Sequence, residues 1–324
     1  MPNKDFYYRF EEKNRGSRDL IKERLKVYLP FILKCKEAHK DCLALDIGCG
    51  RGEWLELMAD NGVRAKGIDL DDGMLGPCRE RGFDVEKADA LEALRKMPDD
   101  SLSIVSGFHI AEHLPFDILL QVVHEAKRVL KPAGLLILET PNPENLCVGA
   151  CNFYIDSTHN HPLPPPLLSF LPEYEGFFRV KILRLQEDKS LAQAKNLSLF
   201  NAIAGASPDY SIVAQKEASQ EILSSFGDLF EKNFGITMHE LCQKYDAGQE
   251  QRAAQQESIF AEQERRIAEQ ECRIAEQNAT LVAQTQRIDA LQKKLDETYN
   301  LLVNTRHRTL YGALAWLFRK VFRR

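Results

Sequence analysis

The chain has 324 residues, of which 44% are hydrophobic and 28% charged, and its formal net charge is -5. This length can hold two domains, and the mean hydropathy of -0.36 indicates a polar, extended portion beside a hydrophobic core. The net negative charge argues against a protein that binds nucleic acid over its whole surface. The eight cysteines include no CxxC pair, and without a recognisable signal peptide we expect free thiols in the cytoplasm. No apolar run reaches the roughly 18 residues of a transmembrane helix.

The segment 5–34 precedes the first expected strand and is predicted to form a helical lid. It begins with an aromatic cluster that includes Tyr8. Ser17 is a suitable N-cap, and the apolar residues after it recur at helical spacing. Arg18 or Arg24 could reach the carboxylate of a ligand under this lid. The alternative is a helix that packs on the sheet and leaves both arginines in solvent.

Residues 43–52, LALDIGCGRG, are typical of a buried strand followed by a glycine loop and the start of a helix. Gly48, Gly50 and Gly52 allow a tight turn and a close approach of the backbone to a ligand, because a Cβ atom would block both. A dinucleotide-binding loop has the spacing G-x-G-x-x-G. Here the spacing is G-x-G-x-G, and the adjacent Asp46 suits an ammonium group better than a phosphate.

Two further expected strands end in acidic residues. The string AKGIDL ends at Asp69 and Leu70, and the string KADA places Asp89 before Ala90. The succession DIGCGRG, GIDL and KADA resembles the S-adenosylmethionine (SAM) dependent methyltransferases of the Rossmann-like class. The resemblance implies an α/β fold with a seven-stranded sheet and SAM as cofactor. It also implies that the three motifs hold the methionine moiety, the ribose and the adenine amino group in turn. The alternative is an unrelated α/β domain with a glycine turn.

The strand expected at 102–108 runs directly into the string HIAEHLP. Ligands of doubly wound sheets bind beyond the carboxyl ends of the strands, so His109, Glu112 and His113 should face the pocket. The pattern H-x-x-E-H also resembles an inverted zinc-peptidase motif. That motif needs a helix with both histidines on one face, whereas here a strand ends and Pro115 follows. We therefore expect no bound metal, and magnesium held by the Glu–His pair is the alternative.

A polar wall for an acceptor is expected after the fifth strand. Residues 152–162 contain Asp156 and His159 among other polar side chains, and the alternative is a solvated loop. The domain closes over 178–214 with a terminal hairpin, whose connecting loop, 186–209, is long.

The pattern changes at residue 249, where a seven-residue apolar repeat begins. Its members are Phe260, Ile267, Ile274, Leu281, Ile288, Leu295 and Leu302. These heptads contain no proline and predict a coiled coil over 249–303, roughly 80 Å long at 1.5 Å per residue. Residues 218–248 are expected to be a helical connector. Glutamines at the partner position favour a parallel homo-oligomer, a trimer rather than a dimer.

The final stretch, 304–324, holds six basic residues and no acid, and its apolar residues share one helical face. This composition predicts a basic amphipathic helix at a membrane interface, attracted by anionic lipid. The alternatives are a calmodulin-type target helix, a nucleic-acid arm or an oligomer contact.

Methyl transfer to an oxygen acceptor requires the protein to hold the acceptor opposite the methyl group and to take its proton. We expect His113 or His159 to be the base, with Glu112 or Asp156 orienting the base or the acceptor. The residues expected to bind the cofactor are Asp46, Gly48, Gly50, Gly52, Asp69, Leu70, Asp89, Ala90, His109, Arg24 and Tyr8.

Three segments resemble the methyltransferase domain of bacterial O-antigen chain terminators of the WbdD type: FEEKNRGSRDLIKERLKVYLPF, GFHIAEHLPF, and ETPNPENL followed by DSTHNHPLPPPLLSF. The resemblance implies that residues 1–217 methylate the non-reducing end of a lipid-linked polysaccharide. It further implies a trimeric coiled coil between the active site and the inner face of the cell membrane, and a C-terminal segment that recruits the polymerase, a glycosyltransferase.

Members of that family that add methyl phosphate also carry a kinase domain. The stretch 220–249 is too short to hold one, so we expect methylation alone. Two alternatives stay open: a membrane-associated scaffold for a glycosyltransferase whose methyltransferase domain has lost activity, and a methyltransferase for a small lipid or a quinone.

Overall fold

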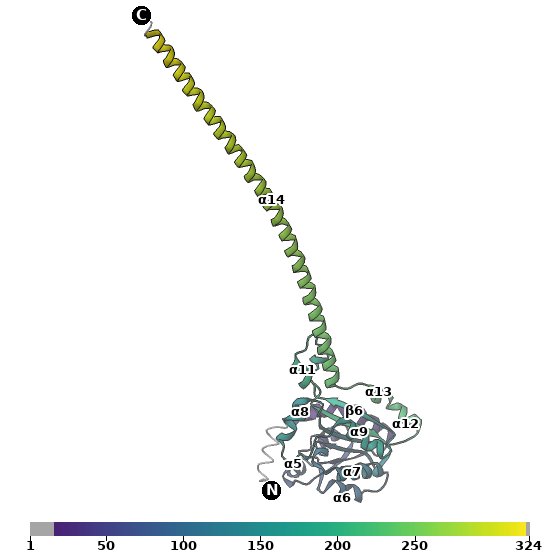
Figure 1. Cartoon of the computed structure of the whole chain (residues 1–324). Coiled ribbons are helices and arrows are strands. Elements are labelled where there is room, and N and C mark those ends of the chain that lie inside the picture. The colour runs from purple at the N-terminus through teal and green to yellow at the C-terminus, as the bar shows by residue number, and fades with distance from the viewer. Residues whose placement is uncertain (1–15, 322–324) are drawn as a thin grey trace. The chain divides into compact units, whose positions relative to one another are not determined.

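The computed structural model describes residues 16–321, so Tyr8 lies outside the described residues. The chain forms two compact units, Met1–Gln249 and Glu250–Arg324. The first contains a seven-stranded sheet in the order β3-β2-β1-β4-β5-β7-β6 (Figure 1). Its strands are β1 (Leu43–Ile47), β2 (Arg64–Asp69), β3 (Asp84–Lys87), β4 (Leu102–Phe108), β5 (Leu130–Pro141), β6 (Arg179–Leu185) and β7 (Asp209–Gln215).

Helices pack against both faces of the sheet, and further helices lie before β1 and after β7. Those before β5 are α2 (Arg18–Leu25), η1 (Lys26–Tyr28), α3 (Leu29–Ala38), α4 (Glu53–Asp60), α5 (Asp72–Glu80), α6 (Ala90–Lys96), η2 (Ala111–His113) and α7 (Phe116–Val129). Those after β5 are α8 (Leu146–Ala150), η3 (Asn152–Ile155), α9 (Pro165–Tyr174), α10 (Ser190–Gln193), α11 (Leu199–Ala204), α12 (Gln220–Ser225), α13 (Gly227–Glu231) and α14 (Met238–Val321).

The core is divided between the two faces of the sheet. Leu45 and Ile47 of β1 belong to one buried cluster, which includes residues of α6, α7 and α9. Ala44 belongs to a second cluster, which includes residues of α3 and α4. This division follows from the strand itself, because successive side chains point to opposite faces. A strand covered on both faces must be mainly apolar on both, as the run LALDI is apart from Asp46.

The direction of the strands decides which residues meet at the edge of the sheet. Strands β1 to β5 run parallel, whereas β7 runs antiparallel between β5 and β6. The carboxyl ends of β1, β2, β4 and β5 therefore share an edge, and β7 begins at that edge, with Asp209 opposite Pro141. The seven-stranded Rossmann-like sheet predicted from the sequence is confirmed.

The connections before and after β7 both contain helices, which was expected for 218–248 but not for 186–209. The connection 186–209, expected as a long loop, contains α10 and α11, and Ser198 and Asn201 form a capping box at the start of α11. The segment 218–248 contains α12, α13 and the first turns of α14, and it buries Phe226 among others. Both segments therefore pack as parts of the first unit.

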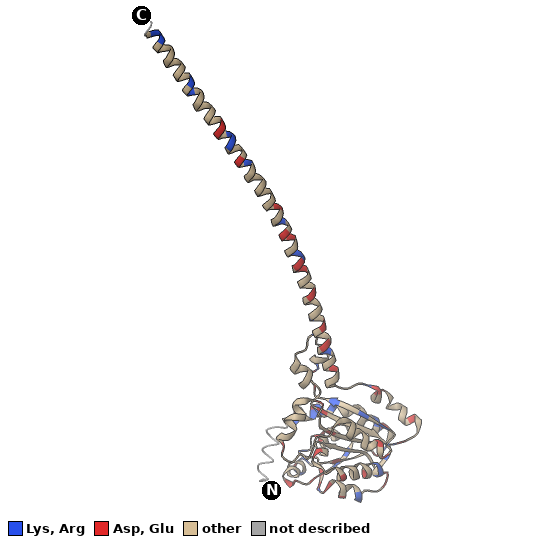
Figure 2. Ribbon diagram, viewed as in Figure 1, with Lys and Arg blue, Asp and Glu red and all other residues tan. Residues whose placement is uncertain are grey.

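Helix α14 is continuous over 84 residues and includes both the predicted coiled coil and most of the predicted interfacial segment (Figure 1). Its heptad residues are exposed in the single chain, for example Ile274 at 55% and Leu281 at 64%. No acidic residue follows Glu297, whereas basic residues continue to the end of the described helix (Figure 2). None of the described helices is long and apolar enough to span a membrane. Association through the heptad residues stays a prediction.

Candidate active site

A cavity of about 420 Å³ lies at the edge of the sheet where the parallel strands end. The glycine loop after β1, the end of β4, helix α2, the start of β7 and the segment around η3 all contribute to its wall. Seven of the predicted site residues line it: Arg24, Asp46, Gly48, His109, His113, Asp156 and His159. Helix α2 thus covers the cavity in the way expected of the predicted lid.

The glycine loop brings backbone close to this cavity. Gly48, Gly50 and Gly52 all have positive φ, at 69°, 51° and 76°, a region that other residues enter only with strain. A Cβ atom on Gly48 would also lie 3.1 Å from the side chain of Ile110. Asp46 is buried and its carboxylate accepts a hydrogen bond of 2.7 Å from the Ser106 hydroxyl of neighbouring β4. The loop therefore has the shape that close approach of a ligand requires.

The predicted ribose and adenine residues lie at the ends of β2 and β3, outside the cavity wall. The carboxylate of Asp69 accepts a hydrogen bond of 2.9 Å from the backbone N–H of Gly50, which ties β2 to the glycine loop. Leu70 beside it is exposed. Asp89 is the N-cap of α6, and one of its oxygens accepts from two backbone N–H groups, while Ala90 is buried. All four residues share the sheet edge with Asp46.

The lid side of the cavity offers groups for a ligand carboxylate. Arg24 lines the wall, and so does Trp54 of α4. Within residues 16–321 the buried indole N–H of Trp54 has no hydrogen-bond partner, so it can donate to a ligand. Arg18, the other arginine proposed from the sequence, pairs instead with Glu56 at 2.6 Å and Glu53 at 3.6 Å. Between the two arginines, the position of Arg24 therefore suits the cofactor carboxylate.

His109 is held between two carboxylates. Its Nδ1 lies 3.2 Å from Glu112 Oε1 and its Nε2 lies 3.6 Å from Glu139 Oε1. Burial by itself lowers the pKa of His109, but the hydrogen bonds to Glu112 and Glu139 outweigh it and raise the pKa well above its usual value. Glu139 also accepts a hydrogen bond from the buried hydroxyl of Tyr28. His109 is therefore a protonated donor and cannot serve as a base.

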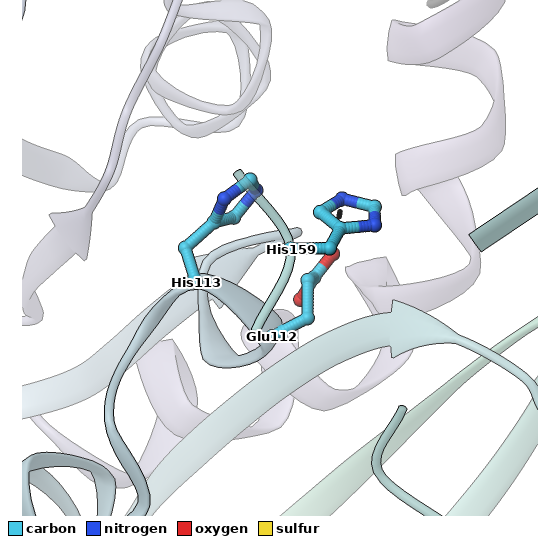
Figure 3. A group of neighbouring side chains, drawn as sticks. All are labelled: Glu112, His113 and His159. Carbon is cyan, nitrogen blue, oxygen red and sulfur yellow. Dashed lines mark ion pairs between the residues drawn. The ribbon is translucent and has the colours of Figure 1, made fainter. Parts of the chain in front are cut away.

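Glu112, His113 and His159 come together beside the cavity, and the two histidines line its wall (Figure 3). Glu112 is fully buried, and its Oε2 accepts a hydrogen bond of 2.9 Å from the Thr140 hydroxyl. Burial raises the pKa of Glu112, but the contact with His109 outweighs this and holds it below the usual value, so the group is a carboxylate. Burial lowers the pKa of His113, which favours its neutral form. The His113 and His159 rings lie edge to face, with centroids 4.7 Å apart.

Hydrogen bonds fix the tautomers of these two histidines. The Nδ1 atom of His159 lies 2.6 Å from the carbonyl oxygen of Phe153, which can only accept, so Nδ1 carries the proton. Thr158 donates its hydroxyl to Asp156 at 2.7 Å and therefore accepts from Nδ1 of His113 at 3.0 Å. In these tautomers of the two rings the lone pair is on Nε2. Asp156 Oδ2 lies 3.9 Å from Nε2 of His159, so all four predicted catalytic residues are neighbours.

Sequence reasoning missed Asp209, Glu139, Trp54 and Tyr28. Asp209 and Glu139 line the cavity. One carboxylate oxygen of each lies within 4.8 Å of the other and of a ring nitrogen of His109. Most of the predicted site residues lie at or just after the carboxyl ends of parallel strands. Asp209 is instead the first residue of an antiparallel strand. Glu139 follows four apolar residues at the end of its strand, and this was a signal that could have been used. Burial raises the pKa of Asp209 to about 6.

Comparisons with known proteins identify the family. A family model described as a methyltransferase domain matches residues 45–138. A solved SAM-dependent methyltransferase from Archaeoglobus fulgidus is 37% identical to the chain, with a TM-score of 0.58; the match covers 65% of this chain and 100% of that one. The chain belongs to the SAM-dependent methyltransferases. S-adenosylmethionine is accordingly the cofactor of this methyltransferase, and the glycine loop, Arg24 and the Trp54 indole fit its binding.

Two further relatives share the methyltransferase core. A probable S-adenosylmethionine-dependent methyltransferase from Mycolicibacterium smegmatis is 33% identical over 133 residues, which are 41% of this chain and 51% of that protein. A ubiquinone biosynthesis O-methyltransferase from Methylococcus capsulatus is 35% identical over 121 residues, which are 35% of this chain and 50% of that protein. The methyltransferase thus spans about half the length of these relatives.

Proposed function

We propose that this methyltransferase transfers a methyl group to a sugar hydroxyl at the non-reducing end of a lipid-linked bacterial surface polysaccharide, without a kinase activity. The observation that carries the proposal is the polar wall formed by His113, Asp156 and His159, with the buried carboxylate of Glu112 next to the two histidines. A sugar presents several hydroxyl groups that need hydrogen-bond partners when they leave water. Carboxylate and imidazole groups at one wall supply both donors and acceptors for them.

The chemistry required of the protein is limited. SAM, when bound, supplies an electrophilic methyl group, and the chain has to align the acceptor oxygen with it and remove the hydroxyl proton. His109 is protonated and contributes a hydrogen-bond donor beside the cofactor residues. His113 and His159 carry lone pairs on Nε2, which agrees with the base role expected for one of them from the sequence.

We propose that the heptad residues of α14 join copies of the chain, with a trimer as the expected assembly, and that 304–324 binds the inner face of the cell membrane. Support comes from the exposed apolar stripe and from a basic segment in which Lys320 lies over the Trp316 ring at 4.7 Å. Tryptophan and basic residues together are typical of membrane interfaces. A glycosyltransferase would be the partner enzyme at that surface.

A second candidate acceptor is a quinone precursor with a ring hydroxyl. The observation that favours it is the 35% identity to a ubiquinone biosynthesis O-methyltransferase. The aliphatic side chains of Ile21 and Ile155 also line the cavity and could contact a ring. The charged groups opposite them fit this acceptor less well, because an aromatic ring offers few hydrogen-bonding atoms.

The test is a competition between acceptors. Purified full-length protein is incubated with methyl-labelled SAM and either a synthetic lipid-linked oligosaccharide or a hydroxylated quinone precursor, and the labelled product is mapped by mass spectrometry. We expect label on the terminal sugar of the glycan. Label on the quinone precursor alone would favour the second candidate. SAM binding without transfer to either acceptor would contradict both.

A further inference from the structure

We propose that Glu112, His113 and His159 bind a divalent transition-metal ion. One carboxylate oxygen of Glu112 and one ring nitrogen of each histidine lie within 4.8 Å of one another. Figure 3 shows the Glu112 carboxylate beneath the His159 ring, with the His113 ring beside them. The residues come from separate parts of the chain, η2 and the loop after η3, so the fold has brought the donors together.

The orientation of each donor is fixed by a neighbouring group. Metal-binding histidines usually donate their other ring N–H to a carbonyl or carboxylate system, which fixes the nitrogen that faces the ion. His159 does so to the carbonyl of Phe153, and His113 does so to the hydroxyl of Thr158, itself bonded to Asp156. Both rings are thus in the tautomer that leaves Nε2 with a lone pair, which a metal ligand requires.

Neighbouring groups also fix the position of the Glu112 carboxylate. Its Oε2 accepts from the Thr140 hydroxyl, and its Oε1 lies 3.2 Å from His109 and 3.9 Å from Nε2 of His159. The side chain is fully buried and therefore has few alternative positions. A carboxylate oxygen that accepts one hydrogen bond keeps a second lone pair, so Glu112 can still bind an ion while it contacts His109.

The donor set selects the class of ion. Two imidazoles and one carboxylate suit zinc, iron or manganese, whereas magnesium prefers oxygen ligands and water. Ligands held at roughly 2.1 Å in a tetrahedral site lie roughly 3.4 Å apart. Nε2 of His159 and Oε1 of Glu112 are 3.9 Å apart, so these two side chains must close slightly on the ion.

The site would have room for an acceptor. Three protein ligands leave at least one coordination position, and His113 and His159 line the cavity. An oxygen atom of an acceptor in the cavity can therefore complete the coordination. A nitrogen bound to a metal ion cannot accept a proton, so these histidines would be ligands in place of the base expected from the sequence. This catalytic consequence rests on the proposed function, whereas ion binding does not.

The test uses Co²⁺ alone as the probe. Full-length protein without a histidine tag is treated with chelator, freed of it, and titrated with Co²⁺ while visible absorption and stoichiometry are followed. We expect one ion per chain, with the absorption of a nitrogen- and oxygen-ligated site. His113→Gln and His159→Gln should each weaken binding about tenfold or more, while His124→Gln, at an exposed histidine that pairs with Glu175, should bind as the unaltered protein does.

Thermal unfolding and SAM binding of the variants show that each is folded. Absence of Co²⁺ binding, equal binding by His159→Gln, or an intense thiolate-to-cobalt band from the partly or fully exposed Cys147 or Cys151 would each overturn the proposal. Because neither SAM nor acceptor takes part in the titration, the result is independent of which acceptor the methyltransferase uses.

Discussion

At the scale of single residues, a cluster of ionisable side chains lies at the cavity, and burial affects the protonation of each of them. Three carboxylates, those of Glu112, Glu139 and Asp209, surround one imidazolium, that of His109. The positive charges of His109 and Arg24 favour an ionised Asp209, but burial opposes them and is the larger effect. Asp209 shows the consequence, since burial raises its pKa from 3.8 to about 6.

This raised pKa makes a prediction about stability. The folded state holds the Asp209 proton more tightly than the unfolded state does, so its contribution is complete below the unfolded pKa near 3.8 and is lost as pH rises through about 6. Asp209→Asn cannot lose a proton. We expect the variant to match the unaltered protein near pH 4 and to be more stable by up to about 2 kcal/mol above pH 7, a value reduced for partial solvation. Urea unfolding across this pH range measures the difference, and a constant difference would contradict the assignment.

The glycine loop allows a matched pair of substitutions. Gly48 and Gly82 have similar positive φ values, 69° and 80°, but a Cβ atom on Gly48 meets Ile110 whereas one on Gly82 meets nothing within 4 Å. Both alanine variants should lose about 1–2 kcal/mol of stability from backbone strain. Only Gly48→Ala should weaken SAM binding, by about tenfold or more, because Gly48 lines the cavity. Calorimetric titration with SAM tests this, and equal affinities in the two variants would count against it.

At the scale of elements, the direction of β7 determines the composition of the site. Because β7 runs antiparallel to β5, its first residue reaches the edge at which the parallel strands end. The same strand carries Tyr210, whose hydroxyl donates to the carbonyl of Leu163 at 2.7 Å. This bond ties β7 to the segment between η3 and α9, which contains His159.

The apolar stripe of α14 predicts self-association. Seven exposed apolar residues at one heptad position cannot be buried within one straight helix, but parallel copies can bury them. The double variant Ile274→Asp with Leu281→Asp should therefore reduce the mass measured by light scattering toward the 37.0 kDa of one chain. The control, Ala279→Asp with Gln286→Asp, adds the same charge outside the stripe and should leave the mass unchanged. Equal masses for the two variants would exclude association through this stripe.

At the scale of the whole molecule, charge is distributed unevenly along the chain. The net charge is -5, yet the last stretch contains only basic charge (Figure 2). Anionic lipid attracts each basic residue near its surface by about 1 kcal/mol, and salt screens the attraction. The apolar residues beside them can enter the interface. Membrane binding through this segment would therefore depend on lipid charge.

Removal of residues 304–324 tests that dependence. The full chain should bind vesicles that contain phosphatidylglycerol at least about tenfold more tightly than vesicles of phosphatidylcholine alone. The shortened chain should lose this preference, and added salt should weaken the binding of the full chain. Co-sedimentation measures both quantities. Undiminished binding by the shortened chain would place any lipid contact elsewhere.

The sequence by itself determined the features that depend on local order. The strand, glycine loop and helix from Leu43 onward follow from neighbouring residues, since backbone conformation and the continuous apolar run of a strand buried on both faces are local properties. Asp46 and Asp69 were identifiable because each lies at the end of its own strand. The heptad repeat of α14 was also recognisable from the sequence, because apolar residues on one face of a coiled-coil helix recur every seven residues.

Tertiary structure alone decided which distant groups meet. Asp209 and Glu139 meet His109 because β7 pairs with β5, and Tyr28 meets Glu139 because η1 packs against the sheet. The tautomers of His113 and His159 depend on Thr158 and on a backbone carbonyl, which no sequence motif specifies. Protonation in such a cluster is set by burial and by charges a few ångströms away. Those distances arise from folding, so the roles of these residues became visible only in the folded chain.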